Sequence, residues 1–327
     1  MKKNIAIVAG GDSSEIVVSL KSAEGIYSFL DKEKYIPYTA IVKQKEWYVI
    51  LPGGERAAIN KNDFSFYEEG TVKHFDFAYI TIHGTPGENG LLQGYFELIG
   101  IPYSSCNPLV SALTFNKFAC NTYLRNFGVR VADAIRLRKG EIYVEEEVIS
   151  RLGLPAFVKP NDGGSSFGVT KVKKPGQLQP AIEKAFEEGE EVIIERCITG
   201  TELTCGCYKV ERKEVVFPLT EVVTKNEFFD FDAKYNGQSD EITPARIPAE
   251  WREKVQSITL RIYDILGAKG IIRVDYILPA GEEPVLLEIN TVPGMTRASF
   301  IPQQVRAAGL DIKEVMTDII ENELKKL

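Results

Sequence analysis

The chain has 327 residues, which is long enough for two or three domains rather than one ordinary core. Its 44% hydrophobic and 26% charged residues are typical of a soluble globular protein, and its net charge of −7 argues against nucleic acid as the main partner. No stretch approaches the roughly 18 consecutive apolar residues of a membrane span, so no membrane partner is expected. The five cysteines have no framework spacing and fit reduced thiols, which predicts a cytoplasmic protein.

The first hundred residues alternate strand and helix patterns. "NIAIVAGG", "YIPYTAIV", "EWYVIL" and "DFAYITIHG" are typical of strands, whereas "SSEIVVSLKSAEGIYSFL" and "GLLQGYFELIG" carry apolar residues at helical spacing. This order predicts an α/β unit over residues 1–104, with an open, mostly parallel, Rossmann-like sheet and functional groups at the carboxyl ends of its strands. No G-x-G-x-x-G follows the first strand, which excludes a dinucleotide-dependent oxidoreductase.

Two polar residues at these strand ends are ambiguous on local evidence. Glu15 opens the first helix, where a carboxylate commonly does no more than complement the helix dipole. His83 ends a strand in "IHGTPGENG", and a lone histidine in such a place is more often structural than functional. Both residues are nevertheless candidates for a site at this edge of the sheet.

A second unit is predicted over residues 105–194. "SALTFNKFACNTYLRNFG" reads as one helix that closes at Gly128, and "QLQPAIEKAFEEG" as another. Between them, "PAFVKP" is a strand that ends near Lys159, and the glycine–serine loop "NDGGSSFG" follows with backbone N–H groups free to meet an anion. The chain has no Walker A motif, so a structural turn and a phosphate site both fit this loop.

The third unit, residues 195–327, is rich in strands and contains a long loop at about 220–243. Glu195 and Glu202 flank a turn near its start, where glutamates are usually solvated. Several aromatic residues crowd the segment "NEFFDFDAKYN" of the loop. The loop is therefore either a lid that presents Lys234 and Tyr235 to a site or a segment held down by a hydrophobic clip.

Four polar residues share one face of two late strands. In "GIIRVDYIL" Arg273 and Asp275 are two apart, and in "PVLLEIN" so are Glu288 and Asn290. If the strands pair, these groups converge, and hard oxygen donors of this kind suit Mg²⁺ bound together with substrate phosphates. The alternative is a salt bridge between Arg273 and Glu288, but the spacing D-x12-E-x-N favours a metal site.

Taken together, the motifs occur in a specific collinear order. The series GG-D-S-S-E…VS, H-G…G-E-N-G, K-P…G-S-S-x-G, E…G-x-E, A-K-Y, R-V-D and E-x-N-T-x-P-G-M-T closely resembles the D-alanine–D-alanine ligase family of the ATP-grasp superfamily, over essentially the whole chain. The resemblance implies an α/β, in part α+β, three-domain ATP-grasp architecture with ATP between the central and C-terminal domains. It also implies ATP-dependent ligation of two D-alanines through an acyl phosphate, which supplies D-alanyl-D-alanine for peptidoglycan precursors.

The resemblance assigns roles to residues that match the family's motifs. It implies two Mg²⁺ ions, with Mn²⁺ as a substitute, one held by Asp275 and Glu288 and the other by Glu288 and Asn290. Arg273 and the Gly294 N–H match the oxyanion donors. The positions that match the family's ATP contacts are Lys117, Lys159, Glu195, Arg196, Ile198, Glu202 and Lys234.

Substrate contacts follow from the same resemblance. Glu15 matches the group that faces the first D-alanine's ammonium, and His83 lies close to its carboxylate. Ser165 and Tyr235 match the partners that tie the loop over the site together with Glu15. Ser299 matches the hydroxyl that receives the second D-alanine's carboxylate, with Phe300 beside it where leucine is usual.

Departures from the family pattern bear mainly on the product. Tyr235 favours the plain dipeptide over D-alanyl-D-lactate or D-alanyl-D-serine, which are the products of the alternative ligases, whereas Phe300 leaves the second site less defined. Ile16, Asn89 and Arg196 also differ from the usual residues. A non-catalytic nucleotide-binding protein is disfavoured because the metal ligands and Arg273 are present. A homodimer is expected, since the family is often dimeric.

Overall fold

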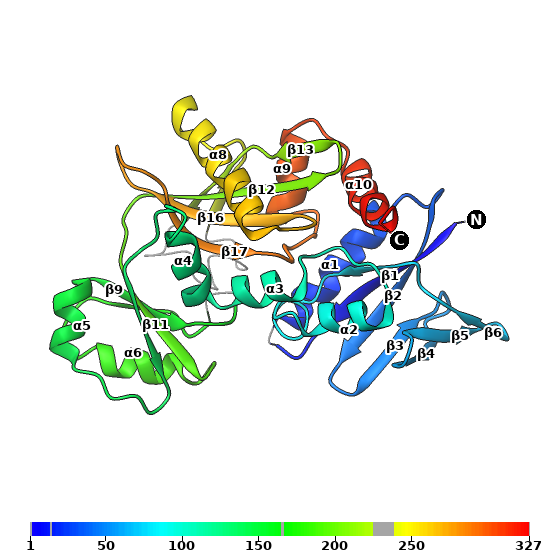
Figure 1. Ribbon diagram of the computed structural model, residues 1–327, viewed down its shortest axis with the longest axis horizontal. Coiled ribbons are helices and arrows are strands. Elements are labelled where there is room, and N and C mark those ends of the chain that lie inside the picture. Colours follow the sequence, from blue (N-terminus) through cyan, green and yellow to red (C-terminus); the bar gives the residue numbers. More distant parts are fainter. Residues whose placement is uncertain (1, 14, 165–166, 225–238, 327) are drawn as a thin grey trace.

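The computed structural model describes residues 2–13, 15–164, 167–224 and 239–326, which form three sheets with helices packed on them (Figure 1). The first sheet has seven strands in the order β6–β5–β4–β3–β2–β1–β7. Helix α1 (Ile16–Phe29) packs with one face of this sheet, and α2 (Leu91–Ile99) packs with the other. The strands are β1 (Lys3–Gly10), β2 (Tyr35–Lys43), β3 (Glu46–Ile50), β4 (Arg56–Asn60), β5 (Ser65–Glu68), β6 (Thr71–Lys73) and β7 (Phe77–Ile80).

The first sheet is mixed rather than mostly parallel. β1 runs parallel to both β2 and β7, as the alternation of strands and helices predicts. The pairs from β2 out to β6 are antiparallel, so the predicted parallel arrangement holds only for β2, β1 and β7 and is wrong for the other strands. β4, β5 and β6 were not predicted, because they are three to five residues long and have mostly exposed or half-buried side chains.

The second sheet is antiparallel and has the order β10–β9–β11–β8. Helices α5 (Glu145–Leu152) and α6 (Leu178–Ala185) share its buried apolar core. In Figure 1 this unit lies at one end of the molecule. Its strands are β8 (Ala134–Arg138), β9 (Ala156–Pro160), β10 (Thr170–Val172) and β11 (Glu191–Arg196).

The helix predicted from "SALTFNKFACNTYLRNFG" is two helices, α3 (Pro108–Phe115) and α4 (Lys117–Arg125). The break falls at Asn116, whose side chain accepts the Ala119 N–H at 2.9 Å and so caps α4. The cap supplies an acceptor for a backbone N–H that has no partner at a new helix start. Apolar spacing continues across the break, so spacing alone did not indicate it. Lys117 thereby becomes the first residue of α4, and its N–H donates to the Asn161 carbonyl at 3.0 Å.

The third sheet has the order β15–β14–β12–β16–β17, with β13 paired to β12. Its apolar face packs against α3, α4 and α8 (Ala249–Leu266), while its other face carries the polar residues described below. The remaining elements are β12 (Thr201–Val210), β13 (Lys213–Val216), β14 (Thr220–Thr224), β15 (Ser239–Ile242), β16 (Ile272–Leu278), β17 (Val285–Asn290), α9 (Phe300–Ala307) and α10 (Ile312–Leu324).

The C-terminal helix returns to the start of the chain. α10 and α9 share a buried core with α1 and β1, so the first and third sheets are joined by apolar packing. The Tyr35 hydroxyl donates to Glu321 on α10 at 2.7 Å. Figure 1 accordingly shows the labelled N and C ends near each other.

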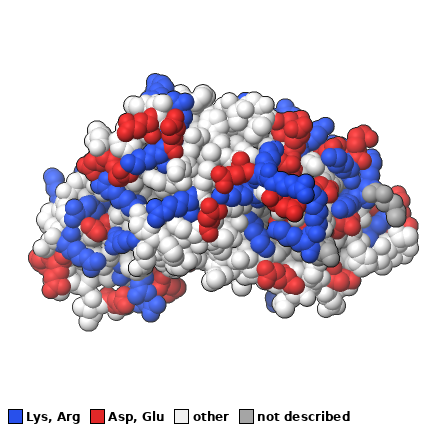
Figure 2. Space-filling view, turned by 45° about the horizontal axis from the view of Figure 1, so that its top comes forward, with Lys and Arg blue, Asp and Glu red and all other residues white. Residues whose placement is uncertain are grey.

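The molecular surface carries both signs of charge. Figure 2 shows basic and acidic side chains interspersed over the visible face, without a broad area of one sign. Among the residues that the structure describes, no helix combines the length and the apolar character needed to cross a bilayer.

The contact between Gly270 and Ser104 allows a test of the packing between the first and third sheets. Gly270 has φ +66°, and a Cβ there would lie 1.9 Å from the Ser104 carbonyl oxygen. Gly267 has φ +60° but open space around it. We expect Gly270→Ala to lower the free energy of unfolding by about 3 kcal/mol or more and Gly267→Ala by only about 1 kcal/mol, measured by urea denaturation. Equal losses would show that the contact contributes nothing.

Candidate active site

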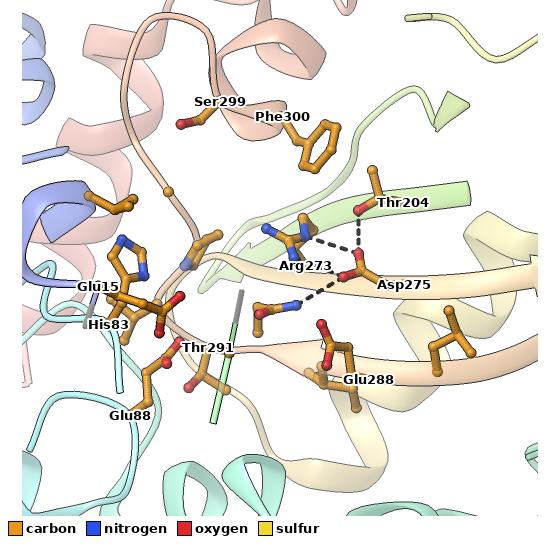
Figure 3. Close-up of a pocket in the computed structure, with 18 of the residues that line it drawn as sticks. Glu15, His83, Glu88, Thr204, Arg273, Asp275, Glu288, Thr291, Ser299 and Phe300 are labelled. Carbon is orange, nitrogen blue, oxygen red and sulfur yellow. Dashed lines mark hydrogen bonds and ion pairs between the residues drawn. The ribbon is translucent and has the colours of Figure 1, made fainter. Parts of the chain in front are cut away.

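A cavity of about 770 Å³ lies where the three sheets meet. Its lining combines residues from the start of α1, the loop after β7, the start of α4, and strands β12, β14, β15, β16 and β17. Figure 3 shows that the labelled side chains of these segments converge on one space. The predicted site residues among the lining are Glu15, His83, Lys117, Glu202, Arg273, Asp275, Glu288, Asn290, Gly294, Ser299 and Phe300.

Pairing of β16 with β17 brings four predicted residues together, as expected from the sequence. The antiparallel register places Arg273 opposite Asn290 and Asp275 opposite Glu288. A register shift follows, since Tyr276 pairs with Leu286, so Leu287 is an extra residue on β17. Two carboxylates directly opposite each other repel, and this arrangement therefore requires positive charge nearby.

Cations from one strand and one helix supply that charge in the structure. The Arg273 guanidinium donates to Asp275 at 2.9 and 2.8 Å, while the Asn290 amide donates to the same carboxylate at 3.1 Å (Figure 3). The Lys117 Nζ lies 3.6 Å from a Glu288 oxygen. The sequence left open a salt bridge of Arg273 with Glu288, whereas the ion pair that Arg273 forms is with Asp275, on its own strand.

The donor set of this ladder has the chemistry of a Mg²⁺ site. Two carboxylates and an amide oxygen are few protein ligands, as is usual for Mg²⁺ when substrate phosphates complete its coordination. In the described part of the chain, no three or more His, Cys, Asp or Glu side chains gather into a metal-binding group made by the protein alone. The opposed carboxylates Asp275 and Glu288 fit a divalent cation because it would add positive charge between two groups that repel each other.

The turn after β17 carries the predicted oxyanion donor. Ser299 precedes α9, and its hydroxyl accepts the Thr296 N–H at 3.1 Å and lies 2.8 Å from the Thr296 hydroxyl. A Cβ on Gly294 would lie 3.0 Å from the Ser299 hydroxyl, so the two predicted groups adjoin each other. The Arg273 guanidinium lies 5.3 Å from the centre of the Phe300 ring, a cation–π contact that orients both residues.

His83 and Glu15 enter the cavity from the first sheet. His83 is 8% exposed, and its Nε2 is a buried polar atom with no hydrogen-bond partner among the described residues. Burial and the Arg273 charge lower the pKa of His83, although Glu15 and a hydrogen bond to the Val292 backbone oppose this. The Glu15 carboxylate packs onto the glycine loop, since a Cβ on Gly164 would lie 2.7 Å from it.

Two predicted ATP ligands form a buried ion pair behind the cavity. The Lys159 Nζ lies 2.7 Å from a Glu195 oxygen, and the two residues are diagonal neighbours on β9 and β11. Burial alone would lower the pKa of Lys159, but the Glu195 and Glu288 carboxylates raise it. Lys159 therefore keeps its positive charge near the metal ligands.

Lys117 lines the cavity, whereas the remaining predicted residues lie away from it or outside the described residues. The Lys117 Nζ donates to the Gly163 carbonyl at 2.6 Å, at the start of the glycine loop. Arg196 is half exposed, with its guanidinium 3.9 Å from Asp133, and neither Arg196 nor Ile198 lines the cavity. Ser165, Lys234 and Tyr235 lie outside the described residues, as does most of the predicted loop at 220–243.

Sequence reasoning missed Thr204 and Glu88. The Thr204 hydroxyl donates to Asp275 at 2.5 Å from the opposite position on β12, and the polar alternation of Glu202 with Thr204 was the available signal. Glu88 stands in the G-E-N-G motif and accepts the Gly84 N–H at 2.7 Å. Burial and the nearby Glu15 and Glu288 carboxylates raise the pKa of Glu88 to about 8, although the Gly84 hydrogen bond and Lys117 lower it.

The raised pKa of Glu88 predicts a pH-dependent stability. The folded protein binds a proton there that the unfolded chain releases above pH ~4.5, so this group destabilises the fold as pH rises towards 8. We expect Glu88→Gln, a neutral isostere, to raise the Tm by about 2–4 °C at pH 8.5 and to leave it nearly unchanged at pH 5. Glu46→Gln, at an exposed position, is the control; a gain for Glu88→Gln that does not grow with pH would contradict the expectation.

Two family models match the chain, one over its N-terminal part and one over its C-terminal part. Residues 4–106 match the model described as D-ala D-ala ligase N-terminus, and residues 123–321 match D-ala D-ala ligase C-terminus. A D-alanine–D-alanine ligase of Parabacteroides distasonis is 76% identical over 99% of this chain and 98% of the relative. One from Phocaeicola vulgatus is 67% identical over 98% and 99%, respectively.

Solved structures agree over the whole length. The VanG D-Ala:D-Ser ligase of Enterococcus faecalis superposes with a TM-score of 0.87 at 31% identity, covering 99% of this chain and all of that one. The D-alanine–D-alanine ligase of Bacillus anthracis complexed with ATP gives 0.79 at 33% identity, covering 99% and 98%. The predicted α/β, ATP-grasp fold is thus confirmed. On this evidence the chain belongs to the D-alanine–D-alanine ligase family.

Proposed function

We propose that this protein joins two D-alanine molecules into D-alanyl-D-alanine at the expense of ATP, for use in peptidoglycan precursors. The observation that carries the proposal is the cavity in which Asp275, Glu288, Arg273, His83 and Glu15 converge. These residues come from segments far apart in the chain, and together they supply groups for a nucleotide phosphate, a carboxylate and an amine.

The proposed reaction has two steps. A carboxylate is a poor electrophile, so ATP first phosphorylates the carboxylate of one D-alanine, giving an acyl phosphate and ADP. The amine of the second D-alanine then attacks: its lone pair forms the C–N bond, and the C–O bond to phosphate breaks with its electrons leaving on phosphate. The amine gives up one proton, and dipeptide and phosphate are released.

ATP lies, in this proposal, between the second and third sheets. Lys117 and Lys159 contact its phosphates, which is supported by their position beside the metal ligands and the glycine loop. Glu202 faces the ribose from the cavity wall, and residues 195–198, which lie outside the cavity lining, are proposed to run along the adenine. Because the Arg196 side chain points to Asp133, only its backbone is available there. Lys234 completes the phosphate contacts.

Asp275 and Glu288 would hold one Mg²⁺ or Mn²⁺ ion, and Glu288 with Asn290 the other. When bound, the metal neutralises the charge on the transferred phosphoryl group. Arg273 stays beside these ligands and, with the Gly294 N–H, stabilises the oxyanion that forms on the attacked carbonyl. The adjacency of Gly294 and Ser299 supports a site for the acceptor there, with the Ser299 hydroxyl receiving its carboxylate and Phe300 beside it.

The first D-alanine is proposed to bind at the first sheet. The Glu15 carboxylate faces its ammonium. The buried Nε2 of His83, which has no hydrogen-bond partner among the described residues, fits a group with a free oxygen, such as the substrate carboxylate. Because burial keeps His83 neutral, it donates or accepts one hydrogen bond without adding a full charge. Ser165 and Tyr235 are proposed to close this side together with Glu15.

A homodimer in the cytoplasm is also proposed. All five cysteines are unpaired, which fits a reducing compartment. Leu91 and Leu98 on α2 and Leu109 on α3 are 64%, 88% and 75% exposed, and such leucines are typical of a contact surface. Sedimentation velocity measures the mass directly.

Glu288→Gln tests the metal assignment. The amide keeps the shape but removes the charge shared by both proposed ions, so we expect ligation to fall by at least ~10²-fold with an unchanged circular dichroism spectrum. Glu282→Gln removes an exposed carboxylate that pairs with Arg130 just before β17, and it should retain activity. Full turnover by Glu288→Gln would remove Glu288 from the metal site.

Product analysis tests the function itself. Phosphate release is measured with ATP and Mg²⁺ plus D-alanine, L-alanine, or D-alanine with D-lactate or D-serine, and products are identified by mass. We expect D-alanine alone to support turnover and to give D-alanyl-D-alanine. Turnover only with a mixed pair would instead assign the alternative ligase activity, which makes D-alanyl-D-lactate or D-alanyl-D-serine. No turnover with any of these substrates would overturn the proposal.

A further inference from the structure

We propose that Ser22 and Gly25 on α1 are positioning residues for the attack of the second D-alanine. They fix the turn that carries Gly294, although they belong to a different sheet unit from that turn. The inference rests on the proposed function, because it concerns how efficiently the acyl phosphate is converted into dipeptide.

Met295, the residue after Gly294, is hydrogen-bonded to α1 through its N–H, and its carbonyl packs closely against the same helix. Its N–H donates to the Ser22 hydroxyl at 3.2 Å, and Ser22 is fully buried. A Cβ on Gly25 would lie 2.2 Å from the Met295 carbonyl oxygen, so only glycine lets the helix approach this closely. The Met295 side chain is 2% exposed, in the core shared by α1, β1 and α9.

The other side of Gly294 is held by the first sheet as well. Val292 is 4% exposed and packs in the core on the opposite face of that sheet, together with α2. Pro293 and Gly294 therefore span a short gap between two anchored residues, Val292 and Met295, and both anchors are supplied by residues before position 105.

This placement separates the two steps of the reaction. Among the described residues proposed for phosphoryl transfer, Lys117 and Lys159 lie on α4 and β9 and the metal ligands on β16 and β17, and none of them is hydrogen-bonded to α1. The Gly294 N–H and the Ser299 hydroxyl belong to the segment that Met295 anchors, and a displacement of about 1 Å in such donors can cost 10²-fold in rate. Loosening the anchor should spare the acyl phosphate but slow its capture by the amine.

The test is the ratio of phosphate released to dipeptide formed in one assay. Water that attacks a waiting acyl phosphate regenerates D-alanine and releases phosphate, so slow capture raises the ratio above one. We expect Ser22→Ala to raise it at least 2-fold and to lower kcat for dipeptide several-fold, with an unchanged KM for ATP. A merely unfolded fraction would lower both products equally and leave the ratio at one.

Ser19→Ala is the matched control. Ser19 is also fully buried on α1, one turn earlier, but its hydroxyl accepts the Gly10 N–H at 3.0 Å within the first sheet. We expect its ratio to stay at one. Gly25→Ala should uncouple more strongly than Ser22→Ala if it folds; if it does not, Ser22→Ala decides. A ratio of one in Ser22→Ala, or equal uncoupling in Ser19→Ala, would overturn the inference, whereas an inactive wild type would instead overturn the proposed function.

Discussion

Asp275 and Glu288 lie opposite each other on the paired strands β16 and β17, and the rest of the site depends on this arrangement. Antiparallel pairing fixes the two carboxylates opposite each other, and their repulsion has to be balanced by positive charge. Arg273 on the same strand and Lys117 at the start of α4 supply it in the structure. The cap at Asn116, which breaks one expected helix into two, is what puts Lys117 at that helix start.

The remaining groups reach this ladder because the chain folds back on itself. α1 and the loop after β7 bring Glu15 and His83 to the cavity, while α10 packs against α1 and joins the last sheet to the first. No single sheet carries a complete set of groups. The apolar cores shared between the units are therefore as much a part of the site as the polar residues that face the cavity.

Much of this arrangement follows from sequence patterns. Strand alternation put Arg273 with Asp275 and Glu288 with Asn290 on one face, and the pairing of the two strands confirms their convergence. Local patterns could not indicate β4 to β6, because short exposed strands lack a strong apolar period, nor the capped break before Lys117. Glu88 was beyond reach and Thr204 had only its alternation with Glu202 as a signal, since the importance of both comes from neighbours on other elements and from burial.

The extra residue Leu287 limits where related chains can gain or lose residues around β17. It sits in β17 between Leu286, which is buried beneath the sheet, and Glu288, which faces the cavity, and its carbonyl accepts the Asn121 amide at 3.3 Å. Loss of Leu287 would leave a regular ladder with Glu288 still opposite Asp275, whereas one residue lost or gained between Glu288 and Asn290 would turn one of these two side chains to the apolar face of the sheet. Changes of length during divergence should therefore be tolerated in the connection at 279–284 and at Leu287, and be absent between positions 288 and 290.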